Sequence, residues 1–193
     1  MRAQPADLDL VPAELFLELA TEAGLAVPSG GPYPMTLRGE LPVPYWNAGV
    51  LSFSAAALQT VIPRWLHWND WLLKRWDRMG AANHFLEQIS LSLTMLELRE
   101  SWSSPGPAYN FPLHLYTEYR SRLQDVTPVI LHYHREMDPD GYFIPHKYVG
   151  LESVLEDANA RIARFWREQA LRSALSPSQP RASYWQRLRL RLR

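Results

Sequence analysis

One stretch in the second half of the chain has hydrophobic residues at helical spacing. From Leu151 to about Leu171 they recur every three or four positions, and such spacing predicts an amphipathic helix with one apolar side. A shorter helix is predicted for residues 12–23, because Pro12 suits a first helical turn and Gly24 suits a left-handed stop. The members of the longer apolar stripe are Leu151, Val154, Leu155, Ala158, Ile162 and Phe165.

Two further helices are predicted near the middle of the chain. Ser54 can cap a helix that reaches about Arg78, and Pro63 must then lie near its first turn or produce a kink. Asn83 can cap the next helix, which reaches about Glu100. The first helix is rich in tryptophan, and these rings either pack into the core or stack on a sugar. The expected inward positions are Trp65, Trp68, Leu72 and Trp76 in the first helix, and Phe85, Ile89, Leu93 and Leu96 in the second.

Strands are expected to be fewer than helices. Val50–Phe53 is a short apolar run that predicts a buried strand, and Val129–Tyr133 predicts a second one. Residues 25–43 and 101–108 are rich in proline, glycine or serine and predict loops, and residues 139–141 predict a turn. The pattern as a whole indicates a helix-rich α/β fold.

Composition restricts the class of protein. The 193 residues are 47% apolar and 21% charged, which predicts one globular domain over residues 1–172 and a tail over 173–193. Twenty basic and twenty acidic residues cancel, so we expect no nucleic-acid partner. The chain has no cysteine, which excludes disulfides and thiolate metal sites. No apolar run approaches the about 20 residues that span a bilayer, so a cytoplasmic location is expected.

The end of the chain is basic. No acidic residue follows Glu168, and from Arg187 to Arg193 arginine alternates with leucine. This segment is either a solvated tail or a peripheral contact with an anionic membrane through residues 181–193, to which Trp185 would add apolar area.

Several polar side chains stand next to the predicted strands and helix starts. Asn47-Ala48-Gly49 precedes the first strand; an amide both donates and accepts hydrogen bonds, and glycine lets a ligand approach the backbone. Glu87-Gln88 lies in the first turn of a helix, where the helix dipole favours a carboxylate. Each of these features is also common as a purely structural one.

A second group of polar residues follows later in the chain. Asn110 lies in a loop, where it either contacts a ligand or holds the loop through backbone hydrogen bonds. His132 ends the second strand and is either a ligand or a histidine satisfied by the backbone. His134 shares its side if the strand continues, and Arg135 could pair with a diphosphate.

Together these segments form an ordered series. The series is Pro44-Tyr45-Trp46-Asn47-Ala48-Gly49-Val50-Leu51, Leu86-Glu87-Gln88-Ile89-Ser90-Leu91, Tyr109-Asn110-Phe111-Pro112 and Ile130-Leu131-His132-Tyr133-His134. In this order and spacing it resembles the acceptor-side half of GT-A-type nucleotide-sugar transferases, the family 8 glycosyltransferases and their relatives. The resemblance covers about residues 3–135 and implies an incomplete GT-A-like domain.

The resemblance implies roles for these residues. Asn47, Ala48 and Gly49 would line the donor sugar, while Glu87 and Gln88 would reach its reacting face, although the family usually has aspartate where this chain has Glu87. His132 would be a ligand to Mn²⁺ or another divalent cation. The family's other two metal ligands come from an Asp-x-Asp motif, which Asp7 and Asp9 match literally, but without a preceding apolar strand.

The implied function is sugar transfer from a nucleotide-sugar donor to a hydroxyl group of a sugar, lipid or protein. Because only 46 residues precede Asn47, we expect a truncated form with weak or no activity unless the nucleotide-binding half is supplied. The alternatives are a non-catalytic remnant that binds glycan or protein, and an assembly protein that docks through its basic tail. An uncovered sheet edge also predicts self-association.

Overall fold

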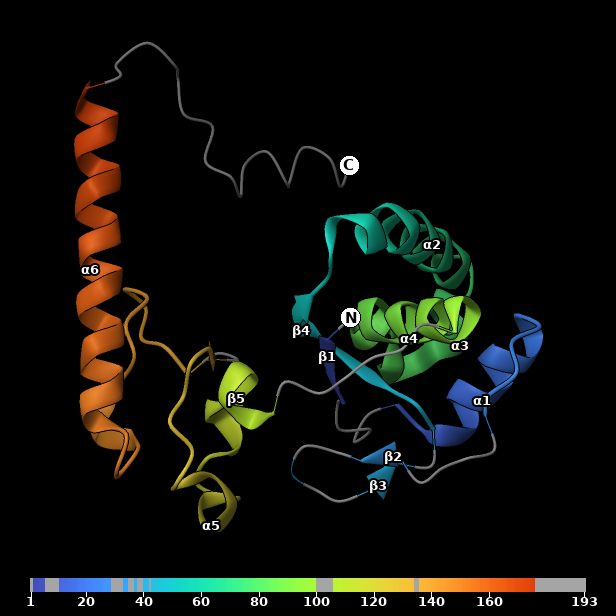
Figure 1. The fold of residues 1–193 in the computed structure, drawn as a ribbon, viewed down its shortest axis with the longest axis horizontal. Coiled ribbons are helices and arrows are strands. Elements are labelled where there is room, and N and C mark those ends of the chain that lie inside the picture. The colour runs from blue at the N-terminus through green and yellow to red at the C-terminus, as the bar shows by residue number, and fades with distance from the viewer. Residues whose placement is uncertain are drawn as a thin grey trace. The chain divides into compact units, whose positions relative to one another are not determined.

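The computed structural model describes residues 2–5, 11–28, 33–34, 37, 40–41, 43–99, 106–133 and 136–175. The chain forms two compact units, residues 1–135 and residues 136–193. The predicted helix-rich mixture of helices and strands is confirmed (Figure 1). In the described ranges the strands form three separate two-stranded sheets, so no central sheet of GT-A type is seen there.

The first unit begins with a helix that the sequence predicts well. Helix α1 spans Ala13–Glu22, follows Pro12, and is closed by Gly24 at a φ of 70°. Its buried side chains are Phe16, Leu19 and Ala20. The loop expected over residues 25–43 is interrupted by a short antiparallel pair, β2 (Tyr33–Pro34) with β3 (Glu40–Leu41).

The helix expected over residues 54–78 is two helices. Helix α2 spans Ala55–Leu73, and its predicted cap is confirmed because the Ser54 hydroxyl accepts a 3.1 Å hydrogen bond from the Ala57 amide. Helix α3 spans Trp76–Met79. The break between them shifts the helical phase, so the prediction that Trp76 faces the core is wrong, and its side chain is 43% exposed. Pro63 lies in the interior of α2 rather than in its first turn.

Helix α4 spans Leu86–Leu98 and follows the 3₁₀ segment η1, Gly80–Phe85. The prediction of Asn83 as the cap is wrong, because Asn83 already lies inside η1 and Phe85 is the residue at the cap. Every residue from Ile89 to Leu96 is buried, not only one side as predicted. A helix buried all round needs its polar groups satisfied. The three buried hydroxyls, those of Ser90, Ser92 and Thr94, donate to carbonyls of the preceding turn.

The core of the first unit surrounds α4. On one side α4 packs with α1 and α2 through a buried cluster that includes Phe16, Leu72 and Ile89. On another side Leu91 and Met95 pack with Trp46 of the following strand. Helix α4 thus lies between the other helices and the strand that carries Asn47 (Figure 1).

That strand is β4, Trp46–Ser52, which pairs antiparallel with β1, Arg2–Pro5. The register joins Arg2 to Ser52 and Pro5 to Trp46, with an irregularity between Ala3 and Gln4. The predicted strand start at Val50 is therefore wrong, and Asn47-Ala48-Gly49 lies inside the strand instead of before it. The pairing partner comes from the chain terminus, a long-range contact that local patterns do not encode.

The third two-stranded sheet contains His132. Strand β5 (Phe111–Pro112) pairs in parallel with β6 (Leu131–His132), which is shorter than the predicted strand over 129–133. The 3₁₀ segment η2 (Pro107–Asn110) precedes β5, and η3 (Leu113–Leu115) and helix α5 (Arg120–Leu123) follow it.

The main element of the second unit is one long helix. Helix α6 spans Glu152–Leu175, follows the 3₁₀ segment η4 (Pro145–Lys147), and continues past the predicted end at about Leu171. The turn predicted for 139–141 is confirmed, with Gly141 at a φ of 84°. Leu151 and Leu155 are buried as predicted, but the prediction that Phe165 faces inward is wrong, because Phe165 is 51% exposed.

Candidate functional site

The structure brings Asn47, Gly49 and His132 together. A Cβ atom added to Gly49 would lie 3.0 Å from Cε1 and 3.4 Å from Nε2 of His132, and 2.7 Å from Oδ1 of Asn47. Gly49 is exposed, while Asn47 and His132 are partly exposed. The space that a side chain on Gly49 would need is thus already occupied by an amide oxygen and an imidazole edge, so two polar side chains from distant segments crowd one exposed backbone position.

Local structure holds the Asn47 side chain against Gly49. Its Oδ1 accepts a 2.6 Å hydrogen bond from the backbone amide of Gly49, two residues further on. Such short-range bonds are typical of asparagine and orient its side chain along its own backbone. The Asn47 amide group is therefore aligned beside Gly49 before any ligand arrives.

A second imidazole stands beside His132. The ring centroids of His114 and His132 are 6.0 Å apart and the rings meet edge to face. Sequence reasoning missed His114, which lies in η3 and is exposed. Its only signal was that it follows Tyr109-Asn110-Phe111-Pro112 by two residues. The parallel pairing of Pro112 with His132 is what brings the two histidines close.

Backbone hydrogen bonds join two segments of the resemblance. The Phe111 amide donates to the Ile130 carbonyl at 2.8 Å, and the Val129 amide donates to the Ala108 carbonyl at 2.8 Å. Strand β4 lies against η2, so three of the four segments meet in one region. These contacts position His132 near Gly49 although 83 positions separate the two residues (132 − 49).

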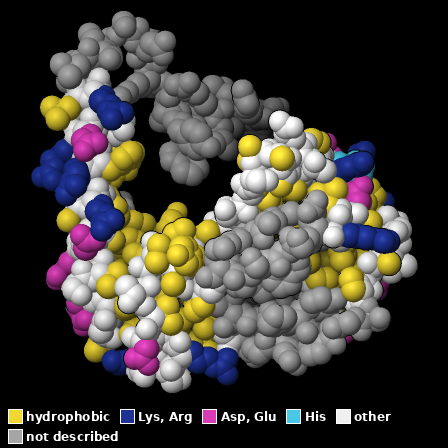
Figure 2. Space-filling model, viewed as in Figure 1, with side chains coloured by type: hydrophobic (Ala, Val, Ile, Leu, Met, Phe, Trp, Pro, Cys, Tyr) yellow, Lys and Arg dark blue, Asp and Glu magenta, His cyan; other side chains and the backbone are white. Residues whose placement is uncertain are grey.

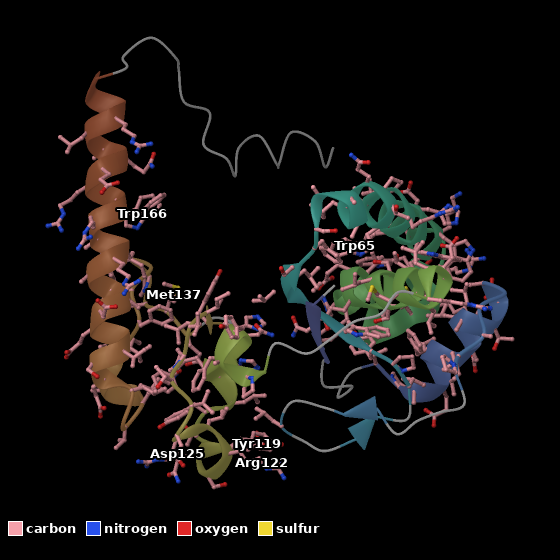
Figure 3. All side chains as sticks on the ribbon, viewed as in Figure 1. Trp65, Tyr119, Arg122, Asp125, Met137 and Trp166 are labelled. Atoms are coloured by element: carbon pink, nitrogen blue, oxygen red, sulfur yellow. The ribbon has the colours of Figure 1, made fainter. Side chains whose placement is uncertain are left out.

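The fourth segment, with Glu87 and Gln88, lies at the start of α4 as predicted. Trp65 lies between α2 and α4, and its indole N–H donates to the Glu87 carbonyl at 3.0 Å and to the Ser90 hydroxyl at 2.9 Å (Figure 3). The Gln88 carbonyl accepts from Ser92, whose hydroxyl in turn accepts from the Trp46 amide. These contacts tie Glu87 and Gln88 to the start of β4, but they do not by themselves join either side chain to His132.

Two buried polar atoms stand near this region. Among the described residues, the Tyr45 hydroxyl and the Asn110 Oδ1 have no hydrogen-bond partner. Burial, with a smaller contribution from the charge of Glu87, raises the pKa of Tyr45 far above its ordinary value, so the phenol stays protonated. Asn110 is 5% exposed, so its side chain is enclosed by the fold.

The described residues offer few of the ligand atoms that a divalent cation needs. Within the described ranges no group of three or more His, Cys, Asp or Glu side chains could hold a metal ion. His132 and His114 supply imidazole nitrogen, whereas Mn²⁺ prefers carboxylate and other oxygen ligands. Oxygen ligands would have to come from a bound diphosphate or from Asp7 and Asp9. Asp7, Asp9, His134 and Arg135 all lie outside the described residues.

Comparisons of the chain with protein-family models, with curated proteins and with solved structures found no match.

Proposed function

We propose that the first unit is the acceptor-side part of a nucleotide-sugar transferase, and that Asn47, Gly49 and His132 form its sugar-facing site. The observation that carries this proposal is the contact between Gly49 and His132. The resemblance assigns these two residues to the same site, and they come from distant segments. A structural role for each residue alone would not require them to meet.

The polar groups around Gly49 suit a sugar. Sugar hydroxyls need closely spaced donors and acceptors, which Asn47 and His132 provide beside the exposed backbone of Gly49. In the proposed reaction the acceptor hydroxyl attacks the anomeric carbon, the bond from that carbon to the diphosphate breaks, and the hydroxyl proton is released. A divalent cation beside His132 would supply charge neutralisation on the leaving diphosphate.

The test uses the paramagnetism of Mn²⁺ on the full chain. We expect Mn²⁺ with a nucleoside diphosphate to broaden the ring proton resonances of His132 and His114 more than those of His67, His84 and His146. His132→Gln should abolish the part of the His114 broadening that depends on nucleotide. The matched control is His67→Gln, because His67 is an exposed histidine on α2. Equal broadening of every exposed histidine, with or without nucleotide, would overturn the proposal.

Binding of saccharide without metal is the second candidate function. The observation in its favour is that the residues around Gly49 offer an amide and imidazoles but no grouped carboxylates in the described ranges. In this case the Gly49 amide resonance should shift on titration with sugar in the presence of a chelator. A shift that appears only with metal and nucleotide would favour the transferase instead.

A further inference from the structure

One side of helix α6 is covered in its first half and exposed in its second. Leu155 is buried, and Asn159 accepts from the Phe143 amide at 2.8 Å and donates to the Phe143 carbonyl at 2.9 Å. The described loop residues of the second unit lie along this half of the helix (Figure 1). The same side continues to Ile162 and Trp166, three and seven residues after Asn159. The apolar side of α6 therefore extends beyond the described loop residues that cover its first half.

Large apolar side chains are exposed on the second half. Phe165 is 51% exposed, Trp166 is 54% exposed and Leu171 is 64% exposed. The rings of Phe165 and Trp166 meet with centroids 5.3 Å apart. Apolar side chains that gather on an exposed surface, unlike single scattered ones, are typical of contact surfaces.

Charge is divided along the same helix. The first half carries Glu152, Glu156 and Asp157, whereas the second half carries one acidic residue, Glu168. Figure 2 shows the dark blue basic side chains of this helix beside exposed yellow apolar ones. The basic residues of the second half are Arg164, Arg167 and Arg172, and Arg161 lies near the end of the first half.

The helix dipole accounts for only part of this arrangement. It favours basic residues in the last turn, which covers Arg172 but not Arg161 or Arg164, and it does not favour exposed aromatic rings. Arg161 pairs with Asp157 at 2.8 Å, but both side chains are exposed, so this pair adds little stability. A ligand that is anionic and apolar at once would satisfy both features.

We propose that the second half of α6 binds the surface of an anionic phospholipid membrane, with Phe165 and Trp166 at the acyl boundary and the arginines on phosphate groups. Guanidinium binds phosphate in a bidentate way, and aromatic rings favour the membrane–water interface. Among the described residues no helix has the length and hydrophobicity to cross a bilayer, so α6 would lie on the surface. A nucleic acid would satisfy the arginines but leave the apolar side chains in water.

The continuing sequence supports the same partner. After Leu175 the chain carries Arg181, Arg187, Arg189, Arg191 and Arg193 and no acidic residue. Since the whole chain has a net charge of 0, attraction to an anionic surface must come from this local excess.

Sedimentation with vesicles tests the proposal on the full chain. We expect binding to phosphatidylcholine vesicles that contain phosphatidylglycerol, loss of binding at high salt, and little binding to pure phosphatidylcholine. Arg164→Gln with Arg167→Gln should weaken binding about tenfold or more, and Phe165→Ser with Trp166→Ser should weaken it similarly. Circular dichroism would confirm that the helix content is unchanged.

Matched controls come from the first unit. Lys74→Gln with Arg120→Gln removes the same charge from exposed positions, and Leu58→Ser with Ile62→Ser removes exposed apolar groups from α2. Both controls should bind vesicles as the unchanged protein does. A further variant replaces the five arginines after Leu175 by glutamine, and it should retain binding that depends on Phe165 and Trp166.

Four results would overturn the proposal. The first two are no binding to anionic vesicles and equal binding to neutral ones. The third is that both α6 variants bind vesicles as the unchanged protein does while the tail variant does not bind at all. The fourth is tighter binding to an RNA homopolymer that is unchanged when Phe165 and Trp166 are replaced.

Discussion

The imidazole of His132 lies against Gly49 so closely that a methyl group on Gly49 would sit 3.0 Å from its Cε1 atom. The backbone of Gly49 is not in the left-handed region, so space and not conformation makes glycine necessary here. Strand β4 and strand β6 are thereby held at a fixed distance at the one point where the proposed sugar-facing site lies.

Gly49→Ala should therefore destabilise the first unit by about 1–3 kcal/mol, because the new methyl group overpacks the contact with His132 and Asn47. The free energy of unfolding from urea denaturation measures this. In a His132→Ala background Gly49→Ala should cost less unfolding free energy, because one of the two side chains that crowd the new methyl group has been removed. Equal costs in the two backgrounds would show that the contact does not constrain the fold.

Trp65→Phe should cost about 1–2 kcal/mol of unfolding free energy. The indole N–H is shared between the Glu87 carbonyl and the Ser90 hydroxyl, at 3.0 Å and 2.9 Å, and phenylalanine cannot donate to either. Chemical denaturation checks the value. Trp76→Phe is the control, because Trp76 is 43% exposed and its replacement should cost less than about 0.5 kcal/mol. A similar cost at both positions would mean that the indole hydrogen bonds contribute nothing.

Asn159 should control local opening of the second unit. Asn159→Ala removes both hydrogen bonds to Phe143, so the Phe143 amide should exchange faster. The free energy of local opening obtained from its exchange rate should fall by about 1–3 kcal/mol. Asn159→Asp keeps the acceptor for that amide and should preserve more of its protection. Asp157→Ala, an exposed neighbour, serves as the control. Unchanged exchange in the alanine variant would contradict the role of this side chain.

Glu22 should make the stability of the first unit depend on pH. Hydrogen bonds from Arg75 and Arg78, with a smaller Coulombic contribution, hold the pKa of Glu22 below its ordinary value of 4.5. A lowered folded-state pKa contributes stability above pH 4.5, and this contribution is lost as the pH falls through the folded-state pKa. Glu22→Gln should therefore be less stable than the unchanged protein near neutral pH, and the difference should vanish in acid.

Thermal unfolding of both proteins, measured from neutral pH down to about pH 3, tests the effect of Glu22. Glu14→Gln, an exposed acidic residue on the same helix, is the control and should show no such convergence. The prediction fails if the Glu22→Gln difference stays constant down to about pH 3.

Local sequence signals determined the helices well. The Pro12 and Gly24 limits of α1, the Ser54 cap of α2 and the stripe of α6 all depend on groups within a few residues of one another, and these interactions form in any context. The Asn83 cap and the single helix over 54–78 failed locally, whereas two other failed predictions involve long-range partners. The extent of β4 depends on Arg2–Pro5, and the exposure of Phe165 depends on where the second unit stops covering α6.

For the candidate site, the sequence by itself determined which residues are suitable, because amide, imidazole and glycine chemistry is intrinsic to the residue type. It identified Asn47, Gly49 and His132 but could not show that they touch, and it missed His114. Only the tertiary structure decided these points, since the parallel pairing of β5 with β6 and the packing of β4 against η2 set distances between segments far apart in the chain. Contacts of this kind depend on the whole fold, which local patterns of hydrophobicity do not specify.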